Sequence, residues 1–249
     1  MKKLNLCLIG MLLIAMPILQ SCDDDGYSLG DFVVRMATVR VISGYDYYLE
    51  IDNGETLYPA ASDVSWYKPT SGQRVVANYT LLSDNYGGYD HAVKVNFLSN
   101  VLTKTVEDLT RENEAEIGND PVDILENGMW IGGKYLNVDF RFDIPTQYRH
   151  RVSLVKNTLV EWPNDGYIHL EYRYNNQDDL SGNWRRSMVS FYLGDYISET
   201  AMKEYKGIKV KINSSVNGER ELTYDFADPS NEENIENSDE IVDPEGKTE

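Results

Sequence analysis

The chain has 249 residues, with 41 acidic and 23 basic side chains and a formal net charge of −18. A chain this acidic repels phosphate backbones, and its lysines and arginines form no stripe, so nucleic acid is excluded as a partner. The two cysteines, Cys7 and Cys22, both lie in the first tenth of the chain. The folded part therefore has no disulfide, no thiolate zinc site and no cysteine nucleophile.

The amino terminus has the features of an export signal. Lys2 and Lys3 precede an apolar run of sixteen residues, 4–19, which is short for crossing a hydrocarbon core of about 30 Å. The letters LQSC at 19–22 then resemble the lipobox of bacterial lipoproteins, whose cysteine becomes the lipidated first residue. We predict a signal peptide over 1–21, lipidation of Cys22 and a tether over 22–30. An ordinary secretory signal with an incidental cysteine is the alternative.

The predicted lipid sets the expected location. Two or more acyl chains anchor a protein stably, whereas a single chain is marginal. Asp23, Asp24 and Asp25 follow Cys22 directly. Such an acidic cluster is either a solvated tether or similar to the signal that sends lipoproteins of some Gram-negative anaerobes to the outer face of the outer membrane. We expect an outer-membrane anchor, facing either the cell surface or the periplasm.

The first half of the folded region has the period of two that is typical of β-strands. Its first apolar run lies on even positions through Met36 and on odd positions from Val39, which predicts a bulged, bent strand with a slip near 37–38. The pair Asn53-Gly54 predicts a hairpin turn. Further apolar faces follow at 75–81, 91–97 and 101–106. About five strands within residues 31–108 indicate a closed barrel of the five-stranded OB type.

The second half is also rich in strands. Residues 109–120 are acidic and are expected to be a linker. Residues 121–227 hold six or more short alternating strands and a helix over 198–205, which favours an antiparallel β-sandwich. Residues 228–249 hold nine acids, one lysine and no aromatic residue, which predicts a disordered tail. The expected fold class is all-β.

Several motifs, in this order, are similar to those of the NigD-like family of bacterial lipoproteins. They are GQRV at 72–75, MWI at 129–131 running into YLN at 135–137, His150 with VSLV at 152–155, and MVSF at 188–191. The similarity spans nearly the whole chain after the signal, except the acidic tail. It implies an N-terminal OB domain, a C-terminal β-sandwich and an anchored lipoprotein of Gram-negative anaerobes. It supplies no enzymatic activity and no set of binding residues.

Tyrosine is unusually abundant, with 18 of 249 residues. Rings on the polar phase of a strand or in a loop can stack on sugars or on a protein partner, as amphipathic aromatics do at interfaces. Our candidate ligand contacts are Tyr48, Tyr86, Tyr89, Tyr167 and Trp184, the last beside Arg185 and Arg186. Tyrosine is also a good strand former, which is the competing explanation.

Histidine offers few sites for metals or for catalysis. His169 and Glu171 lie two apart on one predicted strand, and His150 would complete a partial metal set, although the spacing matches no known site. A surface histidine beside a carboxylate is the more common outcome of such a pair. His91 falls on the apolar phase of its strand, which favours a core or rim position over a catalytic base.

The Gly87-Gly88 segment carries nearby oxygen ligands. Asp84, Asn85 and Asp90 could in principle hold Ca²⁺, but their spacing fits a hairpin turn better than an EF-hand loop. We therefore predict no metal and no cofactor.

The sequence favours a binding role over an enzymatic one. No nucleophile elbow, phosphate-binding loop or zinc-protease helix is present. We predict a non-enzymatic, lipid-anchored outer-membrane protein that acts as a binding or assembly module in the cell envelope, with an envelope protein as its partner. The alternative is a carbohydrate-binding accessory protein at the cell surface.

Overall fold

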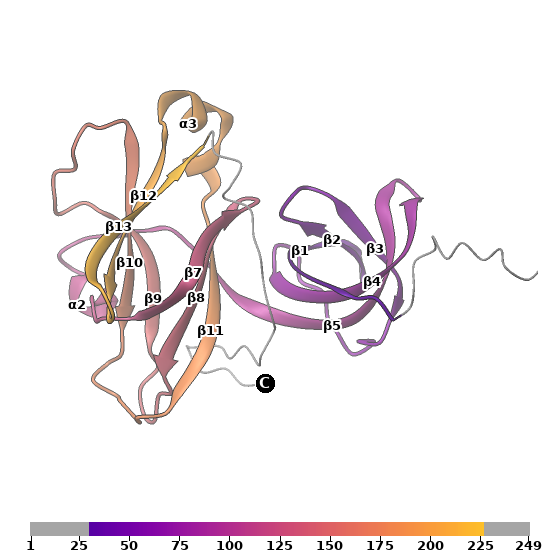
Figure 1. Ribbon diagram of the computed structural model, residues 1–249, viewed down its shortest axis with the longest axis horizontal. Helices are drawn as coiled ribbons and strands as arrows, with labels where there is room; N and C mark the ends of the chain where they lie inside the picture. The colour runs from indigo at the N-terminus through magenta and orange to yellow at the C-terminus, as the bar shows by residue number, and fades with distance from the viewer. Residues whose placement is uncertain (1–29, 227–249) are drawn as a thin grey trace, which may run out of the picture.

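The computed structural model describes residues 30–226, which form two β-domains (Figure 1). The first contains β1 (Val33–Ser43), β2 (Asp46–Ile51), β3 (Thr56–Ser62), β4 (Arg74–Tyr86) and β5 (Tyr89–Thr105). The second contains β6 (Glu107–Leu109), α2 (Glu114–Ile117), β7 (Asp123–Gly132), β8 (Tyr135–Asp143), β9 (Arg151–Asn157), β10 (Tyr167–Asn175), β11 (Trp184–Tyr192), η2 (Gly194–Ile197), α3 (Glu199–Glu204), β12 (Gly207–Ser214) and β13 (Gly218–Asp225). The expected all-β class, with a barrel followed by a sandwich, is confirmed. The predicted signal peptide, Cys22, residues 22–29 of the tether and the acidic tail lie outside the described residues.

The first domain is a closed five-stranded barrel. β1 pairs with β2 and β4, β2 pairs with β3, and β4 pairs with β5, all antiparallel. A parallel pairing of β3 with β5, from Leu57 opposite His91 to Ser62 opposite Val95, closes the ring. The separate strand expected over 101–106 is instead the continuation of β5. This connectivity is that of the OB barrel.

β1 is buried on both faces, which corrects the bulge predicted near 37–38. Its odd residues Ala37 and Val39 point into the barrel core. Met36, on the opposite face, belongs to a second apolar cluster between the domains. The apolar residues change from even to odd positions because both faces of β1 are buried. The shift in register against β2 occurs later in the strand, between Val41 and Ser43.

The second domain is a sandwich of two sheets. One layer is the run β5-β11-β8-β7, and the other has the order β13-β12-β10-β9-β6. Between them lies the main core, whose largest members include Phe140, Phe142, Tyr172 and Phe191. The sandwich is mixed, whereas a purely antiparallel one was expected. β10 and β12 are neighbours in one sheet and run parallel. Between them in sequence, β11 belongs to the other sheet, and η2 and α3 connect it back to β12.

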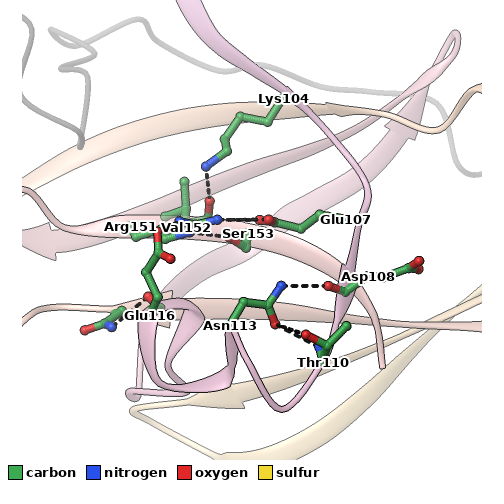
Figure 2. A network of polar contacts seen from close by, with 10 residues as sticks. Lys104, Glu107, Asp108, Thr110, Asn113, Glu116, Arg151, Val152 and Ser153 are labelled. Atoms are coloured by element: carbon green, nitrogen blue, oxygen red, sulfur yellow. Dashed lines mark hydrogen bonds and ion pairs between the residues drawn. The ribbon is translucent and has the colours of Figure 1, made fainter. Parts of the chain in front are cut away.

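The expected linker over 109–120 is wrong, because this segment is part of the sandwich. Leu109 ends β6, which pairs in parallel with β9, and Ile117 of α2 is fully buried. Figure 2 shows how polar contacts hold the segment: Arg151 donates two hydrogen bonds to Glu107 at 2.9 and 3.1 Å and also contacts Glu116. The acids that indicated a solvated linker are thus partly neutralised by a sandwich arginine.

β5 connects the domains as a continuous strand (Figure 1). Its residues Leu102–Thr105 pair in parallel with Val189–Tyr192 of β11, so that one eight-stranded sheet runs through both domains. The junction is filled by Met36, Val76, Val101 and Met188. Because a hydrogen-bonded ladder and an apolar cluster cross the junction, the domains are expected to act as one rigid body. In the described part of the chain, no helix has the length and apolarity needed to cross a membrane.

Candidate functional site

Four tyrosine side chains meet on the outer surface of the barrel, and we call them the tyrosine cluster. They are Tyr48 of β2, Tyr58 of β3, Tyr86 of β4 and Tyr89 of β5. The ring of Tyr58 is stacked against Tyr89 at 5.1 Å and against Tyr86 at 5.6 Å between centroids. Tyr48 contacts Tyr89 at 5.3 Å. Three of the predicted ligand contacts, Tyr48, Tyr86 and Tyr89, are therefore neighbours.

Two hairpins and the closing pair of strands bring the cluster together. Leu49 and Leu57 pair and point into the core, so Tyr48 and Tyr58, the residues flanking that pair, lie on the outer face. The β4–β5 hairpin turns at Gly87-Gly88, both at positive φ, and places Tyr86 opposite Tyr89. The parallel β3–β5 pairing then brings the two hairpins side by side. OB barrels take their ligands on the face of strands 2 and 3 and on the loops beside it.

Carboxylates surround the cluster. The hydroxyl of Tyr58 donates to Asp46 at 3.4 Å, and the negative charge of Asp46 raises the pKa of that phenol. Asp90 accepts hydrogen bonds from the side chain and backbone of Thr56, which lower its pKa and keep it ionised at neutral pH. The nearby cation Arg40, opposite Tyr48, is paired with Glu50 at 2.9 Å. The surface thus offers neutral aromatic faces among negative charges.

A cavity of about 190 Å³ opens at the end of the barrel beside Asp46. Its aromatic lining comes from Tyr45, Tyr47 and Tyr67. Tyr47 and Tyr67 contact each other at 5.8 Å, and burial raises the pKa of Tyr67 to about 12, so its phenol stays neutral. Tyr45 is 72% exposed and stands at the rim. Asp46, which lines the cavity and bonds Tyr58, joins the cavity to the tyrosine cluster.

Tyr167 and Trp184 do not join this surface, because they belong to the sandwich. The hydroxyl of Tyr167 donates to Asp225 at 2.8 Å, and the ammonium of Lys209 lies 4.8 Å from its ring centroid, so this tyrosine is engaged within its own sheet. Trp184 begins β11 and is 60% exposed. The loops beside it also expose Tyr148 and Leu180. All three exposed side chains belong to the sandwich and lie outside the tyrosine cluster.

His150 and His169, which were weighed as parts of a metal set, have other partners. His150 is buried, with Nε2 2.8 Å from the Asp179 carbonyl and Nδ1 2.6 Å from the Tyr174 hydroxyl. His169 is also buried, where a surface position was expected, because Trp162 from the preceding loop stacks on it at 4.8 Å. Within residues 30–226, no group of three or more metal-ligating side chains is suited to hold an ion.

The Gly87-Gly88 segment forms the expected hairpin turn. His91 lies at the rim of the barrel, where Nδ1 contacts Asp84 at 2.7 Å. Asp90 is engaged by Thr56 on the neighbouring hairpin. Asp84 and Asp90, the two acids of this segment, therefore have different partners.

Tyr58 and the cavity residues were missed by sequence reasoning. Counting outward from a two-residue turn at Asn53-Gly54 sets Tyr58 opposite Leu49, whereas the structure pairs Leu49 with Leu57, so the turn signal alone does not locate Tyr58. Tyr67 lies in an irregular segment after β3, and no periodicity locates it. Its approach to Tyr47 depends on the closed barrel.

Known proteins share both domains. Residues 36–101 match the NigD-like N-terminal OB domain, and residues 105–226 match the NigD-like C-terminal beta sandwich domain. The boundary between the two matches falls at the end of β5, where that strand passes from the barrel to β11. No curated protein matches the chain.

Solved structures extend this similarity over most of the chain. A protein of unknown function from Bacteroides vulgatus is 32% identical, with a TM-score of 0.75, over 83% of this chain and 96% of that one. A protein from Parabacteroides distasonis described as toxin-related is 30% identical, with a TM-score of 0.65, over 79% and 95%. A NigD-like immunity protein from Bacteroides caccae is 22% identical, with a TM-score of 0.59, over 80% and 100%, and that similarity shows the fold alone.

Proposed function

The chain belongs to the NigD-like family, and from that premise we propose that it is a non-enzymatic binding or assembly module of the cell envelope whose barrel contacts a protein partner. One observation carries this proposal: four tyrosines from four strands form a continuous aromatic surface on the ligand-binding face of an OB barrel. Tyrosine is enriched in protein interfaces and in their energetic centres. The sandwich then serves as the support that holds this surface.

The composition of the surface argues for a protein partner over other macromolecules. Nucleic-acid barrels combine stacking aromatics with a cationic groove, whereas here the tyrosine cluster is flanked by Asp46, Asp84 and Asp90. These negative charges would repel the phosphate backbone of a nucleic acid. Asp46 also lines the cavity that has Tyr45 at its rim, and Trp66, which is 66% exposed, contacts the cavity residue Tyr67. Exposed aromatic rings of this kind suit a protein partner.

A carbohydrate ligand is the second candidate. The stacked rings of Tyr58 and Tyr89, with a carboxylate at hydrogen-bond distance from one hydroxyl, provide an apolar face and an acceptor for sugar hydroxyls. This combination also suits a glycan at the cell surface.

Anchoring at the outer membrane is the other part of the proposal. It rests on the lipobox at 19–22, with Cys22 as the acylated residue. A Cys22→Ala chain should move from the membrane fraction to the soluble fraction on cell fractionation. Retention in the membrane fraction would show that another feature holds the protein there.

Affinity capture from native membranes tests the binding role. The wild-type chain should retain a protein partner that a Tyr86→Ala/Tyr89→Ala chain loses, since these two substitutions remove half of the tyrosine cluster. Tyr148→Ala is the matched control, because it removes an exposed tyrosine from the sandwich and should leave capture unchanged. The same chains are applied to a glycan array. Glycan binding that depends on Tyr86 and Tyr89, with no captured protein, would replace the protein partner by the carbohydrate alternative.

A further inference from the structure

We infer that the cavity beside Asp46 is a recognition pocket for an arginine side chain of the partner protein. The inference rests on the proposed function and adds the chemistry of the partner. It uses residues outside the tyrosine cluster, so the two ideas can fail separately.

The size of the cavity limits its occupant. Pockets for drug-sized ligands measure roughly 300–1,000 Å³, and this one has about 190 Å³. It therefore has room for about one side chain or one small ring. Pockets of this kind, filled by a single residue of the partner and surrounded by flatter contacts, are typical of protein interfaces.

The walls of the cavity are fixed in place by the barrel. The Tyr67 hydroxyl donates to Asn100 at 3.1 Å, and its backbone amide donates to the carbonyl of Val64. Val64 is itself buried, and its amide donates to the hydroxyl of Ser62 at 3.1 Å. A ligand would thus meet preformed aromatic faces, with little ordering left to be done on binding.

The charge at the rim selects a cation. Asp46 is exposed, and within the described part of the chain it has no ion-pair partner; its single polar contact is the 3.4 Å bond from Tyr58. This differs from Glu50 and Asp63, which are paired with Arg40 and Lys94. An unpaired carboxylate beside tyrosine rings matches a guanidinium, which binds carboxylates in a planar geometry and stacks on aromatic faces.

Arginine suits this site better than the other candidates of similar size. An ammonium group is a compact, strongly hydrated charge and gains less from stacking on rings. A neutral sugar ring could stack, but it would leave the carboxylate of Asp46 without a cation. An arginine side chain can both stack on the tyrosine rings of the pocket and pair with the carboxylate of Asp46.

NMR titration tests the inference. The isotope-labelled chain starts at Asp23 and so contains every described residue. The probe is N-acetyl-arginine amide, and the comparison is N-acetyl-citrulline amide, a neutral molecule of nearly the same shape. We expect the arginine probe to shift the amide signals of residues 45–47 and 62–67, and the citrulline probe to bind at least about tenfold more weakly, as loss of a charge-assisted contact predicts. Equal binding of the two probes, or shifts confined to other regions, would overturn the inference.

Two matched variants locate the charge that matters. Asp46→Asn keeps the acceptor for the Tyr58 hydroxyl and removes the free charge, and it should weaken the arginine probe by about tenfold. Asp63→Asn removes an equal charge from a paired residue and should leave binding unchanged. Equal weakening in both variants would mean that only net charge is sensed and would refute the pocket. Capture that depends on Tyr86 and Tyr89 would still stand in that case, so the proposed function is tested separately.

Discussion

Arg74 illustrates how a single residue can fix the junction of the two domains. Its side chain is fully buried, and its guanidinium donates to both oxygens of Asp52, at 2.6 and 2.8 Å. Asn137 of the sandwich accepts a third bond at 3.3 Å, and the ring of Tyr135 lies 4.4 Å from the guanidinium carbon. The barrel residue Arg74 is therefore held from both domains.

Loss of the Asp52 charge should destabilise the whole protein. Asp52→Asn leaves the guanidinium of Arg74 buried without its counter-ion, which we expect to lower the free energy of unfolding by about 3–5 kcal/mol. Glu50→Gln is the control, because it breaks the partly exposed pair with Arg40 and should cost less than about 1 kcal/mol. Urea unfolding of both variants measures the difference. Similar costs for the two would mean that the junction does not depend on this ion pair.

The sequence indicated Arg74 only as one letter of a short motif. Its partners Asp52 and Asn137 are 22 and 63 positions away, and alternation within a strand carries no information on such distances. The same holds for the tyrosine cluster. The polar phase of Tyr48 could be read from the sequence, but its contact with Tyr89 requires the closed barrel.

Two loops of the sandwich are held by one carboxylate. Asp179 accepts hydrogen bonds from the hydroxyl of Thr146 and from the amides of Thr146, Gln147 and Tyr148, the last two at 2.6 and 2.8 Å. These bonds, the one from the Thr146 side chain first, hold the pKa of Asp179 well below its usual value. They tie the β10–β11 loop to the β8–β9 loop, and both loops carry exposed apolar side chains.

The low pKa of Asp179 predicts a specific dependence of stability on pH. In the unfolded chain an aspartate titrates near pH 4, so the folded state is favoured fully above that value and loses this contribution as the pH falls toward the lower folded pKa. Asp179→Asn removes the titrating group, so its free energy of unfolding should fall less between pH 7 and pH 3 than that of the wild type. Thr146→Val, which removes one donor, should give an intermediate dependence. Parallel pH profiles for all three chains would contradict this assignment.

At the scale of elements, periodicity predicted most strands and their turns. The helix expected over 198–205 is α3, Glu199–Glu204, and the Ser198 hydroxyl accepts a bond from the amide of Ala201 as an N-cap. Periodicity did not predict strands in which the alternation of apolar and polar residues is short or interrupted. β6 has three residues, and β7 is irregular between Ile124 and Met129. The acidic composition of 109–120 was a misleading guide, because Glu116 pairs with Arg151 of the sandwich and Ile117 is buried there.

At the scale of the whole molecule, the two domains share one sheet. The sequence indicated the barrel and the sandwich in the correct order, yet it suggested an acidic linker between them. The continuous β5 and the Arg74 contacts replace that connection with a rigid junction. A rigid support keeps an aromatic surface preorganised, which lowers the entropic cost of binding a partner.

The central claim is that the tyrosine cluster is the surface that contacts the partner, and photo-crosslinking in intact cells tests it most directly. A crosslinking amino acid replaces Tyr86 in one chain and Tyr148 in another, since both positions are exposed, one on the barrel and one on the sandwich. We predict a reproducible protein adduct from position 86, lost when Tyr58→Ala is added, and none from position 148. An adduct from position 148 without one from position 86 would contradict the claim.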